Sequence, residues 1–289
     1  MGSAEGVVLV TGATGTVGRY VAAGLDSQGV PLRRAVRDVG ETQGDQSCRF
    51  DFADPRTWAP ALDGVDRVFL MRPPAISDIK GVIRPFVAEL AHRGIRQTVV
   101  LSLMGVNPAM PHYRLEQDVK AAGLPATMLR PAFFMQNLET AYRSDILTHD
   151  RIRLPARAGK TSFIDTQDIA DVATAALAAP EKHLGKAYTL TGGTALSWNA
   201  VASLLSAELG RPIHYEPISL LTARRELSAA GFPTTYVNVQ LLIHVVARLG
   251  LADTIPSELP QLLGRPPRAL ADYIRDNRDM RISQPQGVE

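Results

Sequence analysis

Three evenly spaced glycines close to the beginning of the chain constrain its fold more than any other feature. Gly12, Gly15 and Gly18 follow the apolar run Val7–Thr11 and precede a helical pattern. The first glycine permits a tight turn, the second lets the backbone approach a ligand, and the third lets the helix pack closely on the strand. The free N–H groups and positive dipole end of that helix favour a phosphate. The residues predicted to bind a dinucleotide here are Gly12, Thr14, Gly15, Thr16, Val17 and Gly18.

Short apolar runs alternate with helical patterns over the first two thirds of the chain. Each run has about the length of a strand and is flanked by Gly, Pro, Asp or Ser. Repeated strand–helix–strand units predict an α/β protein with a doubly wound parallel sheet, the Rossmann arrangement. The predicted strands cover residues 7–11, 32–36, 49–51, 68–71, 98–102, 127–130 and 187–191.

The last third of the 289 residues is mostly helical in pattern. Ser197 is placed to cap one helix, and further helices are predicted at 220–230, 237–249 and 270–275. Because ligands bind beyond the carboxyl ends of the strands in such sheets, a helical lobe there would form the second wall of a cleft. We predict a dinucleotide-binding domain over 1–194 and a smaller substrate-binding lobe over 195–289, with 135–164 contributing to the cleft.

The end of the second predicted strand bears on the choice of cofactor. An acidic residue at this tip would bond the ribose 2′-OH of NAD, whereas an arginine would pair with the 2′-phosphate of NADP. Arg37 comes first and Asp38 follows. We therefore predict NADP(H), although Arg37 could instead be a solvated loop charge. Asp51 and Phe52 are candidates to flank the adenine; the alternative is a loop carboxylate beside a core phenylalanine.

Composition excludes several other classes of protein. The net charge of +2 gives no electrostatic case for nucleic acid. The single cysteine, Cys48, excludes an internal disulfide and a thiolate metal cluster, and the six scattered histidines predict no metal site. No apolar run approaches the roughly 20 residues needed to span a bilayer. We expect a cytoplasmic monomer or homodimer that contacts neither membrane nor nucleic acid.

Several short motifs resemble one known family. In order they are 11–18, 36–38, 50–55 with 57–58, His112-x-x-x-Glu116 leading to Gly123, 129–131, 134–138, 163–165 with 168–170, 188–192 and 264–267. Taken together, the chain resembles the atypical short-chain dehydrogenase/reductases, specifically the NmrA-like group. That group includes NADPH-dependent quinone reductases and ergot-alkaloid-type reductases. The resemblance implies the fold and NAD(P) binding; it implies a reaction less strongly, because the group also includes non-catalytic cofactor sensors.

The catalytic pair of the wider superfamily is missing. Ordinary members use Tyr-x-x-x-Lys, in which the tyrosine exchanges a proton with the carbonyl oxygen. None of the seven tyrosines here is followed by lysine four residues later. This argues against a nucleotide-sugar epimerase or an ordinary alcohol dehydrogenase. Either the reaction needs little enzyme acid, as for a quinone, a conjugated ketone or an iminium, or another residue replaces the tyrosine.

Candidates for a replacement lie where the cleft is expected. Ser102 ends a strand and could hydrogen-bond a substrate carbonyl, or simply bond local backbone. His112 could donate a proton near neutral pH, with Glu116 orienting it, or both could be ordinary surface residues of a helix. Tyr113 could be the acid, or a structurally bonded phenol.

Two further segments are expected to border the ligands. Met71, Arg72 and Pro73 leave the fourth strand, where they would border the nicotinamide half of the cofactor; Arg72 could instead be a surface charge. A second group follows the sixth strand and could line an apolar pocket for a flat aromatic substrate, or belong to the core. Its members are Phe133, Phe134, Met135 and Asn137.

These features favour an NADPH-dependent reductase. Its substrate would be a ketone, quinone or related conjugated group on a small aromatic or polyketide-like metabolite, and binding geometry would supply much of the catalysis. One alternative is a regulator that senses NADP(H) without turning it over. Another is an isomerase or dehydratase that consumes no cofactor.

Overall fold

The computed structural model describes residues 6–38, 46–76 and 78–278. The chain divides into two compact units. The first consists of the described residues up to Pro131 together with Thr166–Leu190, and the second of Ala132–Asp165 together with the described residues from Thr191 onward. The chain therefore passes between the units three times. This division differs from the predicted boundary at 194 and 195, because 132–165 packs with the C-terminal part of the chain.

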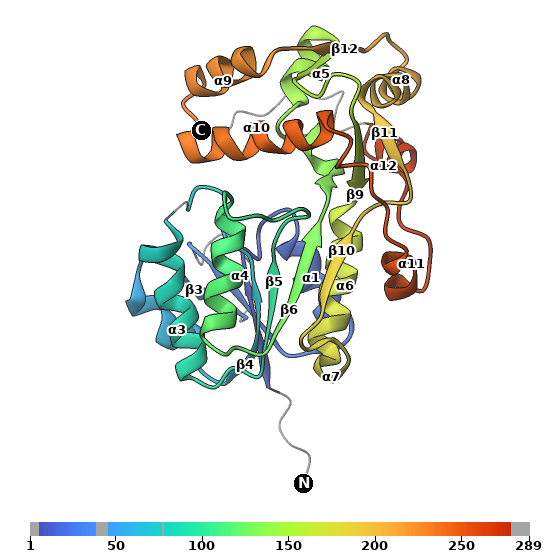
Figure 1. Ribbon diagram of the computed structural model, residues 1–289. Helices are drawn as coiled ribbons and strands as arrows, with labels where there is room; N and C mark the ends of the chain where they lie inside the picture. Colours follow the sequence, from blue (N-terminus) through green and yellow to red (C-terminus); the bar gives the residue numbers. More distant parts are fainter. Residues whose placement is uncertain (1–5, 39–45, 77, 279–289) are drawn as a thin grey trace. The chain divides into compact units, whose positions relative to one another are not determined.

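A seven-stranded parallel sheet forms the centre of the first unit (Figure 1). Its strand order is β10-β6-β5-β4-β1-β2-β3, and every neighbouring pair is parallel. The strands are β1 (Val7–Thr11), β2 (Leu32–Val36), β3 (Ser47–Arg49), β4 (Val65–Leu70), β5 (Gln97–Leu101), β6 (Ala126–Pro131) and β10 (Ala187–Leu190). Because the chain moves from β1 toward β2 on one side and places β4 on the other, the switch point of the topology lies between β1 and β4. The predicted doubly wound α/β class is confirmed.

Helices cover both faces of this sheet (Figure 1). On one face α1 (Gly18–Ser27) packs against α6 (Thr166–Ala178), and α6 contacts β4, β5 and β6. On the other face α3 (Arg84–His92) packs against α4 (Pro111–Ala121). The short elements of this unit are η2 (Pro55–Thr57), α2 (Trp58–Ala61), η3 (Ile79–Ile83) and α7 (Pro180–His183).

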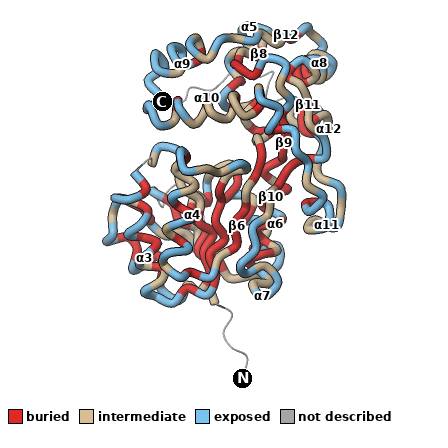
Figure 2. Tube along the Cα trace, viewed as in Figure 1, coloured by how far each residue is buried: buried red, intermediate tan, exposed pale blue. Residues whose placement is uncertain are grey.

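The central strands of the sheet, β1, β4, β5 and β6, are mostly buried, whereas the edge strands β3 and β10 are partly exposed (Figure 2). Leu9, Leu70 and Val100 point to the face covered by α3 and α4, where they join Phe86 and Leu115 in one apolar cluster. Runs that are apolar on both faces are expected of parallel strands covered by helices on both sides. The same cluster contains four aromatic rings in edge-to-face contact, those of Phe50, Phe52, Trp58 and Phe86.

One predicted strand is displaced. The third strand was predicted at 49–51 and lies at Ser47–Arg49. It ends early because Asp51 forms a turn: its N–H donates to Oγ1 of Thr57 at 3.0 Å, and its carboxylate accepts from the N–H of Ala53 at 2.8 Å. Asp51 therefore lies in a loop at the carboxyl edge of the sheet.

The second unit combines short strands with helices. Its strands form a three-stranded sheet, β11-β9-β7, and a pair, β12-β8. The predicted helices are present, and Oγ of Ser197 caps α8 by accepting from the N–H of Ala200. The prediction was incomplete for the short strands. The elements are β7 (Phe133–Phe134), η4 (Met135–Leu138), α5 (Arg143–His149), β8 (Arg151–Leu154), β9 (Lys160–Ile164), β11 (Ala195–Ser197), α8 (Trp198–Leu209), β12 (His214–Pro217), α9 (Leu220–Ala229), α10 (Thr234–Arg248), α11 (Glu258–Leu263) and α12 (Leu270–Asp276).

None of the helices within the described residues has the length and apolar character that crossing a membrane requires.

Candidate active site

The glycine loop has the backbone geometry that its sequence predicts. Gly12 has a φ of 63°, which lies in the left-handed region that favours glycine. The N–H of Gly15 donates to the carbonyl of Gly12 at 2.9 Å and closes the turn. A side chain at Gly18 would overlap that same carbonyl, so only glycine lets α1 begin so close to the loop.

The loop also presents unused hydrogen-bond donors. Within the described residues, the backbone N–H groups of Thr14, Thr16 and Val17 donate to no acceptor. Thr14 is exposed, Thr16 is half-buried, and the side chain of Val17 is buried, so Val17 can reach a ligand only through its backbone. Free N–H groups at the start of a helix suit a phosphate group. The residues present therefore fit the pyrophosphate of a dinucleotide.

Arg37 occupies the position that the cofactor prediction requires. It lies in a bend directly after β2, where its side chain is exposed and makes no interaction with the described residues. An exposed guanidinium at this strand end fits a 2′-phosphate, because it can form paired charge-assisted hydrogen bonds with it. The neighbouring Asp38 is also exposed.

The residues predicted to flank the adenine fit their alternative interpretation better. The ring of Phe52 is 5% exposed and belongs to the aromatic cluster under α3. Asp51 is half-buried, and its carboxylate is bonded to the turn that follows β3. Phe52 is thus a core residue, and its ring is in edge-to-face contact with the rings of Phe50 and Phe86.

The segment after β4 packs against the glycine loop. Oγ1 of Thr11 donates to the carbonyl of Phe69 at 2.9 Å and accepts from the N–H of Met71 at 2.8 Å, which joins β1 to the end of β4. The methyl group of Met71 occupies the space that a side chain at Gly12 would need, and Met71 also limits the space at Gly15. Met71 therefore borders the predicted cofactor loop.

Arg72 is bound within the protein and is not a surface charge. Its Nη1 donates to the carbonyls of Pro73 at 2.8 Å, Pro74 at 3.2 Å and Ile76 at 2.6 Å. Within the described part of the chain no carboxylate pairs with it. Burial lowers the pKa of Arg72 to about 10, so the guanidinium stays charged at neutral pH.

A hydrogen-bonded cluster that no sequence motif indicated joins the buried Ser102 and Glu116 to the half-buried Arg130. Oγ of Ser102 donates to Oε1 of Glu116 at 2.6 Å. Arg130 donates to the same carboxylate through Nε at 2.9 Å and Nη2 at 2.6 Å. Burial alone would raise the pKa of the Glu116 carboxyl, but the hydrogen bonds from Arg130 and Ser102 hold it below its ordinary value.

This cluster changes the expected roles of two residues. An ionised carboxylate only accepts hydrogen bonds, so the hydroxyl hydrogen of Ser102 is committed to Glu116. Only lone pairs of the Ser102 hydroxyl remain for a further partner, so Ser102 would not supply the donor expected of it. Glu116, which is 1% exposed, holds Ser102 and Arg130 and is neither an exposed helix charge nor hydrogen-bonded to His112.

His112 begins α4 and contacts Arg72. Its Nε2 lies 3.4 Å from Nη2 of Arg72. Burial, and then the charge of Arg72, lower the pKa of His112 to about 4, against a smaller opposite effect of Glu116. The imidazole is therefore neutral at neutral pH, so His112 would meet a ligand as a neutral group rather than as an imidazolium. The adjacent Tyr113 is half-buried, and its phenol has no partner among the described residues.

The residues predicted to contact the substrate lie in the second unit. Phe133 is half-buried, with its ring against those of Tyr142, Phe163 and Trp198. Met135 is 1% exposed and belongs to the core, as its alternative interpretation holds. Phe134 and Asn137 are half-buried.

The same aromatic cluster contains a polar pair that no motif revealed. The hydroxyl of Tyr142 lies 3.2 Å from Nε2 of His244, and both residues are buried. Burial raises the pKa of Tyr142 and lowers that of His244 to about 4. Tyr142 and His244 are 102 positions apart in sequence, so only the tertiary structure brings them together.

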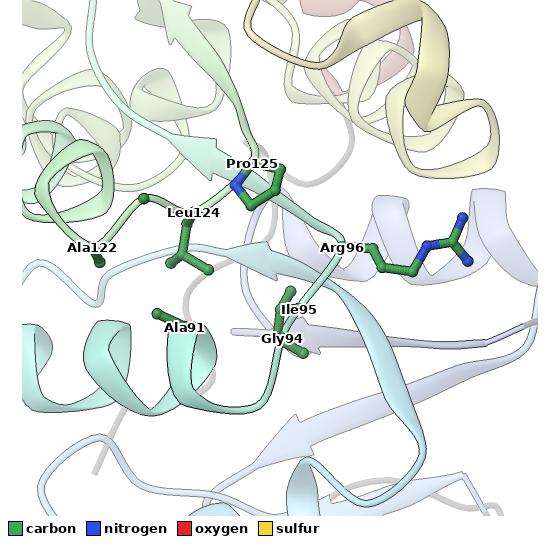
Figure 3. A pocket seen from close by; sticks show the side chains of 8 residues that line it. Ala91, Gly94, Ile95, Arg96, Ala122, Leu124 and Pro125 are labelled. Atoms are coloured by element: carbon green, nitrogen blue, oxygen red, sulfur yellow. The ribbon is translucent and has the colours of Figure 1, made fainter.

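A cavity of about 450 Å³ lies at the opposite edge of the sheet (Figure 3). Its lining comes from the ends of α3 and α4 and from the residues that lead into the amino ends of β5 and β6, such as Ile95, Arg96 and Leu124. None of the candidate cofactor-binding, substrate-binding or catalytic residues lines it. The described residues also contain no group of three or more His, Cys, Asp or Glu placed to hold a metal ion.

A comparison with family models confirms the family that the sequence motifs indicated. Residues 4–256 match the model of the NmrA-like family. The chain belongs to this family. It is 32% identical over 280 residues to an NAD(P)H azoreductase of Xenophilus azovorans, covering 93% of this chain and 97% of the relative. It is 29% identical over 285 residues to an agroclavine dehydrogenase of Claviceps fusiformis, covering 94% and 98%.

This chain shares its fold with solved structures. An NADPH-dependent quinone oxidoreductase of Escherichia coli, complexed with NADPH, superposes with a TM-score of 0.81 at 23% identity and covers 93% of this chain and 99% of its own. At this level of identity the likeness establishes the fold alone.

Proposed function

We propose that this NmrA-like protein is an NAD(P)H-dependent reductase that prefers NADPH. One observation carries the proposal: the loop that follows β1 has unused backbone N–H groups, and β1 pairs with β2, which is followed by Arg37. Arg37 is exposed and has no partner among the described residues. These two features match the pyrophosphate and the 2′-phosphate of one ligand. Support comes from the azoreductase and dehydrogenase relatives, whose names describe redox reactions.

The proton donors at the carboxyl edge of the sheet restrict the substrate. Ser102 has committed its hydrogen to Glu116, His112 is neutral, and no tyrosine is followed by lysine at the required spacing. The nicotinamide, when bound, would supply a hydride. Without a strong acid nearby, the favoured acceptors are those whose reduced form is a stabilised anion or a neutral amine. We therefore propose a quinone, a conjugated ketone or an iminium on a small aromatic molecule as substrate.

The cofactor preference is tested by calorimetry with Arg37→Ala. Because charge-assisted hydrogen bonds contribute about 1.5–3 kcal/mol, the variant is expected to bind NADPH roughly 10- to 100-fold more weakly while its affinity for NADH stays unchanged. Arg96→Ala is the matched control, since Arg96 is exposed at the amino edge of the sheet. Equal losses for NADPH and NADH, or no loss, would contradict the assignment of Arg37.

Turnover is tested by NADPH oxidation over a panel of quinones, conjugated ketones and iminium compounds. We expect activity with the quinones and iminium compounds and little with simple aliphatic ketones. Tight NADPH binding without turnover of any acceptor would favour the non-catalytic sensor instead. Product formation without net NADPH consumption would favour an isomerase or dehydratase.

A further inference from the structure

The contact between Arg72 and His112 fixes the position of the imidazole hydrogen. An arginine side chain has five N–H donors and no acceptor. In the 3.4 Å contact, Nη2 of Arg72 therefore donates and Nε2 of His112 accepts. Because the ring is neutral at neutral pH, its single N–H hydrogen must lie on Nδ1. The geometry selects one of the two tautomers.

The hydrogen on Nδ1 has no acceptor in the part of the chain that the structure describes. Nδ1 of His112 is buried without a hydrogen-bond partner, and the same holds for Nε of Arg72. An unsatisfied buried donor destabilises the folded state, and such groups are rare in folded proteins. Both unsatisfied atoms are donors on two side chains in contact, so the group that satisfies them is an acceptor.

These two side chains lie at the edge of the sheet where a ligand is expected. Arg72 follows β4, which pairs with β1, and the glycine loop follows β1. His112 begins α4, on the same unit. His112 as a residue is half-buried, whereas its Nδ1 is buried. A ligand oxygen therefore reaches Nδ1 only when the atoms that cover it move aside.

We propose that His112 is a neutral hydrogen-bond donor that holds an oxygen of the substrate through Nδ1, and that Arg72 is the positioning residue that fixes its tautomer. The proposal rests on the proposed reductase activity and deepens it. It assigns the ligand atom as an oxygen on which negative charge accumulates, such as that of a quinone carbonyl. A preorganised neutral imidazole can stabilise such an oxygen without giving up a proton first.

The chemical step balances without an enzyme acid. The reductant would be bound NADPH, whose C4–H bond would break and leave the nicotinamide oxidised. As the hydride bonds to one carbonyl oxygen of the quinone, the π electrons of the conjugated system move to the other carbonyl oxygen. That oxygen becomes an anion that accepts the hydrogen bond from Nδ1 of His112. The positively charged Arg72 lies on the other side of the imidazole, next to Nε2. The proton that completes the hydroquinone comes from water as the product leaves.

The tautomer is tested without any substrate, by ¹H–¹⁵N correlation spectra of the full chain with labelled histidine. We expect the His112 signals to show hydrogen on Nδ1 and none on Nε2 at pH 7. In Arg72→Met the donor to Nε2 is lost, and the spectrum should shift toward the other tautomer. A wild-type protein with hydrogen on Nε2 would overturn the proposal, whatever the outcome of the activity assays.

The donor role is tested by replacing the imidazole with amides. Asn carries its N–H close to the position of Nδ1, whereas Gln carries it close to that of Nε2. With the quinone that the wild type reduces best, His112→Asn should keep kcat within about 10-fold, while His112→Gln and His112→Phe lose roughly 100-fold or more. The affinity for NADPH, measured by calorimetry, should be the same in all three variants.

Two results separate the failure of this inference from failure of the proposed function. Equal losses in the Asn and Gln variants, with the wild type active, would overturn the donor role alone. A wild type that reduces no acceptor would remove the proposed function, and the tautomer of His112 would then decide whether the contact with Arg72 is as inferred. Normal NADPH binding by the variants shows that they are folded.

Discussion

Two histidines with the same low pKa have very different hydrogen-bond surroundings in the two parts of this molecule. His112 in the first unit and His244 in the second both have a pKa of about 4. Burial is the main cause for both, but only His112 also has a cation beside it. His244 shares its Nε2 with the hydroxyl of Tyr142 inside an aromatic cluster, whereas His112 faces Arg72 and has an unsatisfied Nδ1.

The difference separates a structural imidazole from one prepared for a ligand. Around His244 the polar contact lies between two side chains of the same core, so the pair satisfies itself. Around His112, Nδ1 of the imidazole and Nε of Arg72 have no acceptor among the described residues. A bound molecule with an acceptor atom would satisfy them. A shifted pKa alone therefore does not identify a functional histidine; the hydrogen-bond inventory around the ring does.

The largest expected effect is on stability at mildly acidic pH. An unfolded histidine has its ordinary pKa of 6.5, so unfolding takes up protons as the pH falls from 6.5 toward 4. The stabilisation is complete above pH 6.5 and is lost as the pH falls. Between pH 7 and pH 5 we expect a loss of about 2 kcal/mol from His244, and less from the half-buried His112.

Urea unfolding at the two pH values measures this loss. Trp198 lies in the cluster around His244, so its fluorescence in a Trp58→Phe background reports on the second unit. His244→Phe should show a clearly smaller difference between pH 7 and pH 5, and the exposed His92→Phe should behave like the wild type. The same pH difference in all three proteins would show that His244 is not held neutral.

A smaller effect is expected when the partner of His244 loses its hydroxyl. Tyr142→Phe leaves Nε2 of a buried imidazole without its hydrogen bond, which costs about 1–2 kcal/mol in the free energy of unfolding. Tyr20→Phe is the matched control, because its hydroxyl bonds Arg19 at an exposed position and should cost under about 0.5 kcal/mol. Equal losses in the free energy of unfolding for the two substitutions would show that the buried hydrogen bond stabilises the protein no more than the exposed one.

The smallest expected effect is a change in the pKa of His112 when the neighbouring positive charge is removed. Arg72→Met removes the cation beside His112, so the pKa of His112 should rise but stay below 6.5, since burial remains the larger cause. Tyr142→Phe should leave the pKa of His244 low, because burial is its cause. NMR titration of both histidines measures the two values. A pKa of His112 that does not move in Arg72→Met would show that the two side chains are not in contact.

The sequence was sufficient for features that depend on neighbours along the chain. The glycine loop, the position of Arg37 after β2 and the cap at Ser197 each follow from local spacing, and the structure has the geometry they require. The short strands of the second unit were missed, because two to five residues carry too little periodicity to distinguish a strand from a loop.

The site depended on contacts that no local pattern encodes. The cluster joins Ser102, directly after β5, to Glu116 on α4 and Arg130 on β6. Only the packing of α4 against these neighbouring strands brings the three side chains together. Spacing suggested that Glu116 supports His112, four residues before it. The carboxylate instead satisfies an arginine on the neighbouring strand, since a buried charge needs an opposite one.

The three passages of the chain between the units limit how the protein can be cut or recombined. A fragment that stops at Pro131 would lack α6, which packs against α1, and β10, which extends the sheet beside β6. Neither unit is one continuous piece of chain, so exchanging the second unit with that of a relative requires three matched junctions. Swapping specificity between such proteins by joining two halves at one point is therefore expected to give an unfolded product.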